Sequence, residues 1–555
     1  MTTPIDPRLA VRDGEHLAPT RLRTRLRLDA PPATALLWQA ALLGISGDAL
    51  LRDGGPGPGL AIWVAVLALA ALSLTWTAGR RVPREAAVWL GLAVLLASCL
   101  AWRDALRFLD IFATMGALVA AAVALRDPAL ALAAPRLRDT LWAGFAIALS
   151  TARGILPLAL RELFIGERRA GAREHARVTL RLSLIVAALL LVFGSLLRSA
   201  DPIFASLVAL PDFDVGTMVS HVLLIGFCAW IAGGWAYGAL VESPSLRRAP
   251  ERVPFTLSAL DLTTALGTLT VLFGAYVLTQ LGWFFGGERF LRATTGLTAA
   301  QYARQGFFQM VWVVALVVPL LLVTRAALAP EPALERRHSV LSLPIVVLLG
   351  AIIGSAALRM RLYVHYYGLT TDRLYTLVFM GWLAIVLALL AATVLRGRGR
   401  PFVAGSVVSA LTLLLGLHVA VPDVIVARID IARAQSPSAR TRLDLPYLAS
   451  LSGDAIPLAV AATLAAPTAG EARDASDADA HCAAASRLLY QWGPASRAAE
   501  RRQSDGAWRS WNAGEAGALR AVGEHSAELR RMRHATCSSG WQSRAHQREG
   551  ARDDD

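Results

Sequence analysis

The sequence predicts an all-α, polytopic membrane protein with about eleven spans. Of its 555 residues, 55% are hydrophobic and only 17% are charged, whereas soluble domains carry about 25% charged residues. The apolar residues are grouped in blocks of roughly 20, which is the length of helix that crosses a bilayer. Because backbone groups in hydrocarbon must bond within their own segment, these blocks are expected to be helices.

The first predicted span follows a polar, arginine-rich segment, residues 1–32, and the last ends at residue 421. In order, the predicted spans are 33–51, 59–78, 86–102, 105–125, 181–198, 217–240, 257–279, 303–325, 340–358, 374–395 and 402–421.

Arginines gather in alternate connections, which predicts the orientation of the chain. Cytoplasmic loops carry the excess of basic residues in membrane proteins. The N-terminus is therefore expected inside the cell and the C-terminus outside. The clustered arginines are Arg80, Arg81, Arg84, Arg126, Arg136, Arg138, Arg168, Arg169, Arg173, Arg177, Arg247, Arg248, Arg252, Arg336, Arg337, Arg396, Arg398 and Arg400.

The segment 139–160 leaves two alternatives open. It is apolar but is interrupted by Arg153 and Pro157. Counted as a span, it would give twelve spans and would move the arginines that follow it to the outside. An amphipathic or re-entrant helix at the cytoplasmic face preserves the alternation of charge.

The composition changes after residue 421, which predicts a small extracytoplasmic segment over 422–520. Helix-like stretches surround Leu443–Leu451, and residues 521–555 have the low apolar content of a disordered tail. If this segment is outside, Cys482 and Cys537 could form a disulfide, and free thiols are the alternative. Cys99 and Cys228 lie in apolar blocks, as packing residues do.

A net charge of +14 does not indicate nucleic-acid binding here, because the basic residues, all of them arginine, lie between apolar blocks. The sequence has no P-loop, no HExxH, no GxSxG and no zinc-finger spacing. We therefore expect no cofactor and no metal, and a non-enzymatic role is favoured. The bilayer is the one certain partner.

Two outer loops and the helix ends beside them carry the candidate ligand-binding residues. Arginine and tyrosine side chains suit phosphate, carboxylate or sugar groups. The functional hypothesis is an outer-face site for an anionic or glycan-bearing ligand. The alternative is an aromatic belt with arginines that reach the headgroups. The candidate residues are Glu288, Arg289, Tyr302, Arg304, Arg359, Arg361, Tyr363, Tyr367, Asp372 and Arg373.

Few ionisable residues lie within the predicted spans. Asp110 is a candidate proton or ion relay, although an i,i+3 pair with Arg107 would explain it structurally. Asp261 follows Ser258 with the spacing of a capping box. His221 and His418 lie near outer helix ends without a second ligand at metal spacing, which indicates interfacial positions.

Several motifs resemble a bacterial polytopic inner-membrane family of the "domain of unknown function 4153/4173" type. The resemblance covers roughly residues 35–515 and implies an inner-membrane protein without assigned chemistry. The motifs that carry it are Tyr302-Ala303-Arg304-Gln305-Gly306-Phe307-Phe308, Arg359-Met360-Arg361-Leu362-Tyr363, Tyr367-Gly368-Leu369-Thr370, Arg373-Leu374-Tyr375, Leu443-Asp444, Tyr447-Leu448, Leu451-Ser452, Asp454-Ala455 and Trp508-Arg509-Ser510-Trp511-Asn512.

Three functional hypotheses follow. The first is transport or flux of a small or lipid-linked anionic solute, supported by the many spans, by helices interrupted at Pro319, Gly350 and Gly354, and by the outer arginines and tyrosines. The second is a non-catalytic envelope or signalling partner that docks through its outer loops and tail. The third is a membrane-embedded transferase, for which Glu288 is the acid to test.

Overall fold

The computed structural model describes most of the membrane-embedded chain and most of the C-terminal segment. In the described residues every regular element is a helix, and Leu257 and Leu328 form an isolated bridge. The all-α fold class is thus confirmed. The described residues are 33–52, 55–126, 137–160, 215–241, 257–295, 307–329, 331–397, 400–435, 443–465, 475–494 and 507–537, with three single positions between 178 and 186.

Eight helices of the described chain are long and apolar enough to cross a membrane. This makes the chain a membrane protein, while the total of eleven spans is not confirmed. The prediction at 181–198 falls almost entirely outside the described residues. The predicted span 86–102 corresponds to α4 (Arg84–Cys99), which has 16 residues and is too short to be among the eight. The predicted span 303–325 corresponds to α13 (Phe307–Ala326), whose apolar part, Trp312–Ala326, is also too short. The eight helices cover Ala33–Leu51, Pro58–Thr77, Arg107–Arg126, Gly216–Leu240, Ala259–Thr279, Pro332–His365, Thr371–Arg396 and Pro401–Ala420.

A first group of helices shares one apolar core: α2 (Ala33–Leu51), α3 (Pro58–Thr77), α4, α5 (Arg107–Arg126), α6 (Leu137–Arg153) and α10 (Val215–Leu240). Small residues let α2 and α10 approach closely, as they do between membrane helices. A Cβ atom added at Gly44 would lie 2.6 Å from the carbonyl oxygen of Ile225, and one at Gly47 would lie 2.6 Å from the sulfur of Cys228. These glycines therefore fix the contact between helices that are far apart in the sequence.

The segment 139–160 is helical in two pieces, α6 and α7 (Leu156–Leu160). The break falls at Gly154, whose φ of +68° favours glycine, and the indole of Trp230 packs directly against this residue. Pro157 comes after the break, in the first turn of α7. At 17 residues, α6 is not among the eight long apolar helices.

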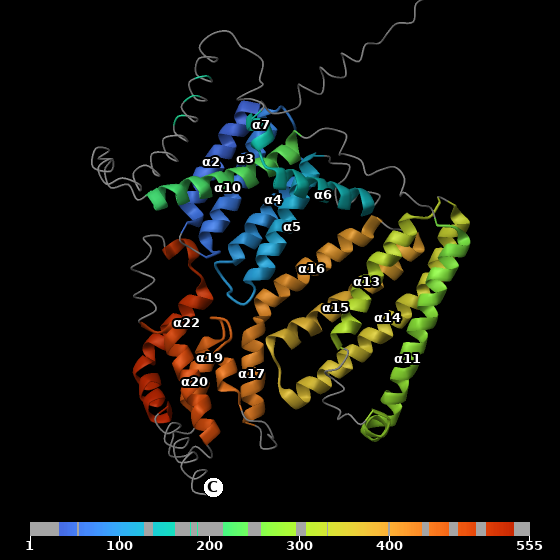
Figure 1. Cartoon of the computed structure of the whole chain (residues 1–555), viewed down its shortest axis with the longest axis vertical. Helices are drawn as coiled ribbons and strands as arrows, with labels where there is room; N and C mark the ends of the chain where they lie inside the picture. The colour runs from blue at the N-terminus through green and yellow to red at the C-terminus, as the bar shows by residue number, and fades with distance from the viewer. Residues whose placement is uncertain are drawn as a thin grey trace, which may run out of the picture.

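A second group has its own core, formed by α11 (Ala259–Thr295), α13, α14 (Pro332–Tyr367) and α15 (Thr371–Ala392). The predicted capping box begins α11: the amide of Ser258 donates to the Asp261 carboxylate at 2.9 Å, and the amide of Asp261 donates to the Ser258 hydroxyl at 3.2 Å. α16 (Arg400–Ala420) joins the two groups, because Leu414 belongs to the first core and Phe402 to the second. Figure 1 shows α16 running between the groups.

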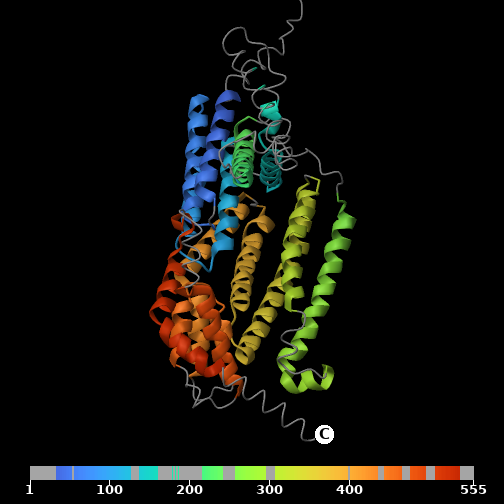
Figure 2. The same cartoon turned by 60° about the vertical axis from the view of Figure 1, so that its left-hand side comes forward.

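Residues 422–537, here called the C-terminal domain, form a third unit at one end of the helix groups (Figures 1 and 2). Its apolar core lies entirely between Ala427 and Leu529. A backbone joint at Val421, with φ of +52°, connects it to α16. It contains α17 (Pro422–Ala434), α18 (Leu445–Leu448), α19 (Ile456–Ala465), α20 (Ala475–Trp492), a 3-10 helix η6 (Ala507–Ser510), α22 (Ala513–Glu524) and a helical stretch over 526–537.

A disulfide between Cys482 and Cys537, whose Cα atoms are 5.1 Å apart, ties the last helical stretch to α20. Residues 521–537 are thus helical where the sequence indicates a disordered tail. Residues 538–555 lie outside the described part.

The two ends of the helix groups differ in the residues that they present. Near the C-terminal domain, the turn between α4 and α5 meets the start of α15, where Tyr375 donates to the carbonyl of Ala105 at 3.1 Å. At the other end Arg80 donates to the carbonyl of Leu125 at 2.8 Å, where α3 and α5 finish. Arg80, one of the clustered arginines, therefore lies at the end of the first helix group that is away from the C-terminal domain.

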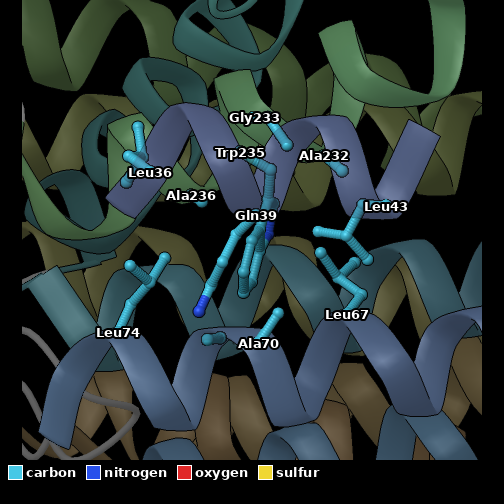
Figure 3. A pocket seen from close by; sticks show the side chains of 12 residues that line it. Leu36, Gln39, Leu43, Leu67, Ala70, Leu74, Ala232, Gly233, Trp235 and Ala236 are labelled. Atoms are coloured by element: carbon cyan, nitrogen blue, oxygen red, sulfur yellow. The ribbon is translucent and has the colours of Figure 1, made fainter. Parts of the chain in front are cut away.

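Within the first group, α2, α3 and α10 enclose a small cavity (Figure 3). Its one strongly polar lining group is Gln39, which donates to the Ser73 hydroxyl at 2.7 Å. The volume of about 10 Å³ suits a single water molecule. This cavity is a packing feature and is too small to be a solute site.

Candidate functional site

The structure divides the predicted ligand-binding residues among several positions. Tyr302 and Arg304 lie outside the described residues, as do the side chains of Glu288 and Arg289 at the end of α11. The others lie in the last turns of α14 and the first turn of α15. They are Arg359, Arg361, Tyr363, Tyr367, Asp372 and Arg373.

Arg373 closes the C-terminal end of α14. Its guanidinium lies over the ring of Tyr363, 4.2 Å from the centroid, and donates to the carbonyl oxygens of Tyr367, at 3.2 Å, and Gly368. The rings of Tyr363 and Tyr367 are 4.9 Å apart. Unpaired carbonyls at a helix end favour cationic donors, and a cation over an aromatic face is stabilising. Three of the predicted residues are thus brought together in a helix-ending arrangement at Gly368, where φ is +85°.

The other three predicted residues that the structure describes, Arg359, Arg361 and Asp372, are not part of this helix-ending arrangement. Arg359 is buried, with 3% of its surface exposed, whereas Arg361 and Asp372 are exposed. A hollow of about 60 Å³ lies beside Tyr367, where α14 meets α17. Binding sites for small molecules are several times larger, so this hollow holds a few water molecules and no solute of ordinary size.

The wall of this hollow is charged and well bonded. Asp430 accepts from the amide of Leu369 at 3.0 Å, and burial raises the pKa of its carboxyl. Arg433 donates to the carbonyls of Val364, at 2.9 Å, and His365, at 2.7 Å. α17, a helix of the C-terminal domain, therefore supplies hydrogen-bond partners to the backbone at the C-terminal end of α14.

Asp110 has a partner that the sequence interpretation did not give it. It is fully buried, and His418 Nε2 lies 3.2 Å from its carboxylate. The predicted i,i+3 pair with Arg107 is wrong, because Arg107 turns away toward Asp104 and Glu515. His418 lies in the last turn of α16, is 1% exposed and faces Asp110 on α5. The two residues are 308 positions apart, so no local spacing could reveal the pair.

The bonds of the imidazole define the proton content of this pair. His418 Nδ1 lies 2.9 Å from the carbonyl of Leu414, which can only accept, so Nδ1 carries a proton. A bond between Nε2 and the carboxylate then requires one further proton, on Asp110 or on Nε2. One oxygen of Asp110 and the hydroxyl of Thr114, one turn further along α5, have no hydrogen-bond partner among the described residues. The pair can thus hold one exchangeable proton in a buried setting.

Aromatic and cationic groups cover the pair on the side of the C-terminal domain. The ring of Trp102 stacks on His418 with centroids 6.1 Å apart. The Arg103 guanidinium lies 4.7 Å from the centre of the Trp102 ring and donates from Nε to the carbonyl of His418 at 3.2 Å. The turn between α4 and α5 therefore shields the pair from water.

Two carboxylates hold the C-terminal domain to this turn in a reciprocal way. Asp454 accepts from the amides of Asp104, at 2.8 Å, and Ala105, at 3.1 Å. In return Asp104 accepts from the amide of Gly453 at 2.7 Å. Asp454 also lies 3.3 Å from Arg103. Because these amides precede the first turn of α5, Asp454 supplies the negative charge that a helix N-terminus favours. This set of bonds is called the docking contact below.

The Trp508–Asn512 motif has a clear structural role at the same place. The buried Asn512 side chain donates to the carbonyl of Leu100 at 2.8 Å and accepts from the amide of Glu515 at 3.2 Å. The next amide, of Ala513, donates to the carbonyl of Ala101 at 2.9 Å. Asn512 followed by Glu515 is a helix-start signal that sequence inspection could have found, although its partner across the interface could not be.

A second carboxylate–histidine pair lies where α2 ends and α10 begins. His221 Nδ1 lies 2.6 Å from Asp48, which also accepts from Arg52 Nε at 3.0 Å. This pair is more open, since the side chain of His221 is 42% exposed. In the described part of the chain no group of three or more metal-ligating side chains is assembled.

Comparison with known proteins places the chain in one family. No curated protein and no solved structure matches it. The model of the family described as "Domain of unknown function (DUF4153)" matches residues 90–462, from α4 to α19, which is more than half of the chain. The match includes Asp110, His418 and Asp454. The chain therefore belongs to the DUF4153 family of membrane proteins.

Proposed function

We propose that this protein moves a small or lipid-linked anionic solute across the membrane, and that Asp110 and His418 carry the proton that is coupled to this movement. The observation that carries the proposal is the buried carboxylate–imidazole pair between α5 and α16. Ionisable residues inside membrane spans are costly and mark ion or proton pathways. A pair that holds one proton between two helices suits the exchange of a proton during a change of conformation.

The position of α16 supports the coupling. It contacts both helix cores, so a relative movement of the two groups would change the surroundings of His418. When the Asp110–His418 pair loses its shared proton, the Asp110 carboxylate faces the lone pair of His418 Nε2. The repulsion between these two groups favours separation of α5 from α16. Protonation would bring them together again.

The orientation is proposed from two independent features. The arginine-rich connections favour the cytoplasm of a bacterial cell, and the Cys482–Cys537 disulfide favours an oxidising compartment for the C-terminal domain. Both support an inner-membrane protein with its N-terminus inside and its C-terminus outside. Asp110 and His418 then lie near the outer surface, beneath the C-terminal domain.

The anionic nature of the solute is proposed from the arginines of the outer face. Arg361 is exposed at the end of α14, and Arg304 belongs to the outer-face set that the sequence predicts. Guanidinium groups bind phosphate and carboxylate through paired donors. In this proposal the solute reaches Arg361 before it passes between the helix groups.

Proton movement in proteoliposomes tests the function. The purified protein is reconstituted with a pH-sensitive dye inside, and inorganic phosphate, small carboxylates and a polyprenyl phosphate are added in turn outside. At least one anion should change the internal pH with wild-type protein. Asp110→Asn and His418→Gln should abolish this change, and Arg304→Gln with Arg361→Gln should weaken it.

Asp48→Asn is the matched control, because Asp48 also pairs with a histidine but does so at an open helix end. It should leave proton movement intact. Proton movement by Asp110→Asn and His418→Gln at the wild-type rate would refute the role of the pair. If no anion in the panel produced a pH change with wild-type protein, transport of these solutes would be refuted.

A second candidate function, a partner protein of the envelope, is favoured by the separate core of the C-terminal domain. A domain with its own core can present a surface to another protein. Crosslinking from the exposed Tyr490 in living cells should then recover one defined protein. Its recovery together with an unchanged solute distribution in the deletion strain would favour this function over transport.

A further inference from the structure

The Trp508–Trp511 turn presents an unusual aromatic surface for a polar domain. Trp508 and Trp511 are each 50% exposed. The amide of Trp511 donates to the carbonyl of Trp508 at 3.3 Å, which is a 3-10 turn. Side chains three residues apart in such a turn are eclipsed. The two indoles therefore share one side of the turn, while Asn512 behind them is buried against the membrane helices.

This turn lies at the level where the spans end. A Cβ atom added at Gly57 would lie 2.8 Å from the carbonyl oxygen of Arg509, and one at Gly59 would lie 3.2 Å from the Cβ of Arg509. These glycines flank Pro58, the first residue of the span α3. In both views the red C-terminal part of the chain meets the lower ends of the blue helices (Figures 1 and 2).

The neighbouring surface of α3 is apolar and continues toward this turn. Ile62, in the first turns of α3, is 42% exposed, and Leu69, two turns further, is 66% exposed. Side chains of this kind on a membrane span face the acyl chains. Tryptophan is enriched at the boundary between acyl chains and headgroups, because its ring is apolar and its N–H needs a polar partner. Arg509, between the two tryptophans in the sequence, packs its Cβ toward Gly59 and so seats the turn on the first turn of α3.

We propose that Trp508 and Trp511 form a lipid-binding face, by which the C-terminal domain is anchored in the headgroup–acyl boundary of the adjoining leaflet. The partner is a phospholipid surface. The turn is then held by two contacts: Asn512 bonds to the carbonyl of Leu100 in the protein, and the two indoles contact lipid. The domain lies on the membrane as well as on the helix ends.

Site-directed spin labelling tests this face directly. Trp508→Cys and Trp511→Cys are made singly and labelled with a nitroxide in nanodiscs of phosphatidylethanolamine and phosphatidylglycerol. No cysteine removal is needed, since Cys99 and Cys228 are buried and the other two are bonded to each other. Collision with oxygen, which concentrates in lipid, is compared with collision with a water-soluble nickel complex.

Tyr490→Cys is the control, because Tyr490 is 84% exposed on α20, which lies on the side of the domain farther from the helix groups (Figure 1). Labels at 508 and 511 should show an oxygen-to-nickel collision ratio several-fold above that at 490. Equal ratios at the three positions would overturn the proposal. A high ratio that is found only in discs with two protein copies, with close label-to-label distances, would also overturn it in favour of a self-associating surface.

Labels could fail because the tryptophans are needed for folding, so a second measurement is included. Trp508→Phe with Trp511→Phe keeps the aromatic packing but removes both N–H donors. Quenching of the total tryptophan fluorescence by lipids brominated near the headgroup should fall in this variant. Unchanged quenching would contradict the lipid contact.

Discussion

Replacing Asp454 with alanine should release the C-terminal domain from the membrane helices. Asp454 is 3% exposed and accepts from the amides of Asp104 and Ala105. A fully buried amide that loses its acceptor costs about 1–3 kcal/mol, and the amides of Asp104 and Ala105 are half-buried. The pair with Arg103, which is one-quarter exposed, adds at most about 1 kcal/mol. Two amides would give about 2–6 kcal/mol at full burial, and partial exposure to water lowers this value, so the docked state should lose about 3 kcal/mol.

Amide hydrogen exchange measured by mass spectrometry is the assay. A loss of about 3 kcal/mol raises the population of the undocked state roughly 100-fold, so peptides covering 99–107 and 450–455 should exchange faster by that factor. Asp454→Asn keeps one acceptor oxygen for the two amides but puts an NH2 donor where Oδ1 faces Arg103, so its exchange should lie between that of wild type and that of Asp454→Ala.

Asp444→Ala is the matched control within the same domain. Asp444 caps α18 by accepting from the amide of Tyr447 at 3.0 Å, and its loss costs about 1 kcal/mol locally. Exchange at 99–107 should not change in this variant. If Asp454→Ala exchanged like wild type in both peptides, the docking contact would not be what holds the domain, and the argument would fail.

Three further predictions concern pH, packing and redox state. Burial raises the pKa of the Asp423 carboxyl above its ordinary value of 3.8, so the folded state binds this proton more tightly than the unfolded state does. The free energy of unfolding should therefore fall as the pH rises above 3.8. Asp423→Asn should remove this part of the pH dependence in denaturation measured from pH 4 to 7. Gly154→Ala should destabilise the first helix group by about 2 kcal/mol or more, because its Cβ would lie 1.5 Å from the Trp230 ring, and an unchanged melting temperature would contradict this. Cys482 and Cys537 should react with a maleimide polymer only after reduction, and labelling of both without reductant would exclude the disulfide.

Features set within one segment could be predicted from the sequence. Most of the described spans lie within a few residues of the predicted ones, because the length of an apolar block is a local property. The exceptions are α11 (Ala259–Thr295) and α14 (Pro332–Tyr367), which run well beyond the predicted spans 257–279 and 340–358. The Ser258–Asp261 capping box is likewise local and is confirmed. The predicted grouping of outer arginines and tyrosines was found in part, at Arg373, because Tyr363 and Tyr367 precede it by only a few residues.

The sequence by itself determined that the chain is a helical membrane protein and where most of its apolar helices lie. Tertiary structure alone decided that Asp110 faces His418 and that Asp454 caps α5 from another domain. The reason is that a helix presents side chains in every direction, and its own period does not say which face meets which neighbour. That choice depends on the contacts of the whole assembly, such as the glycines between α2 and α10 and the joint at Val421.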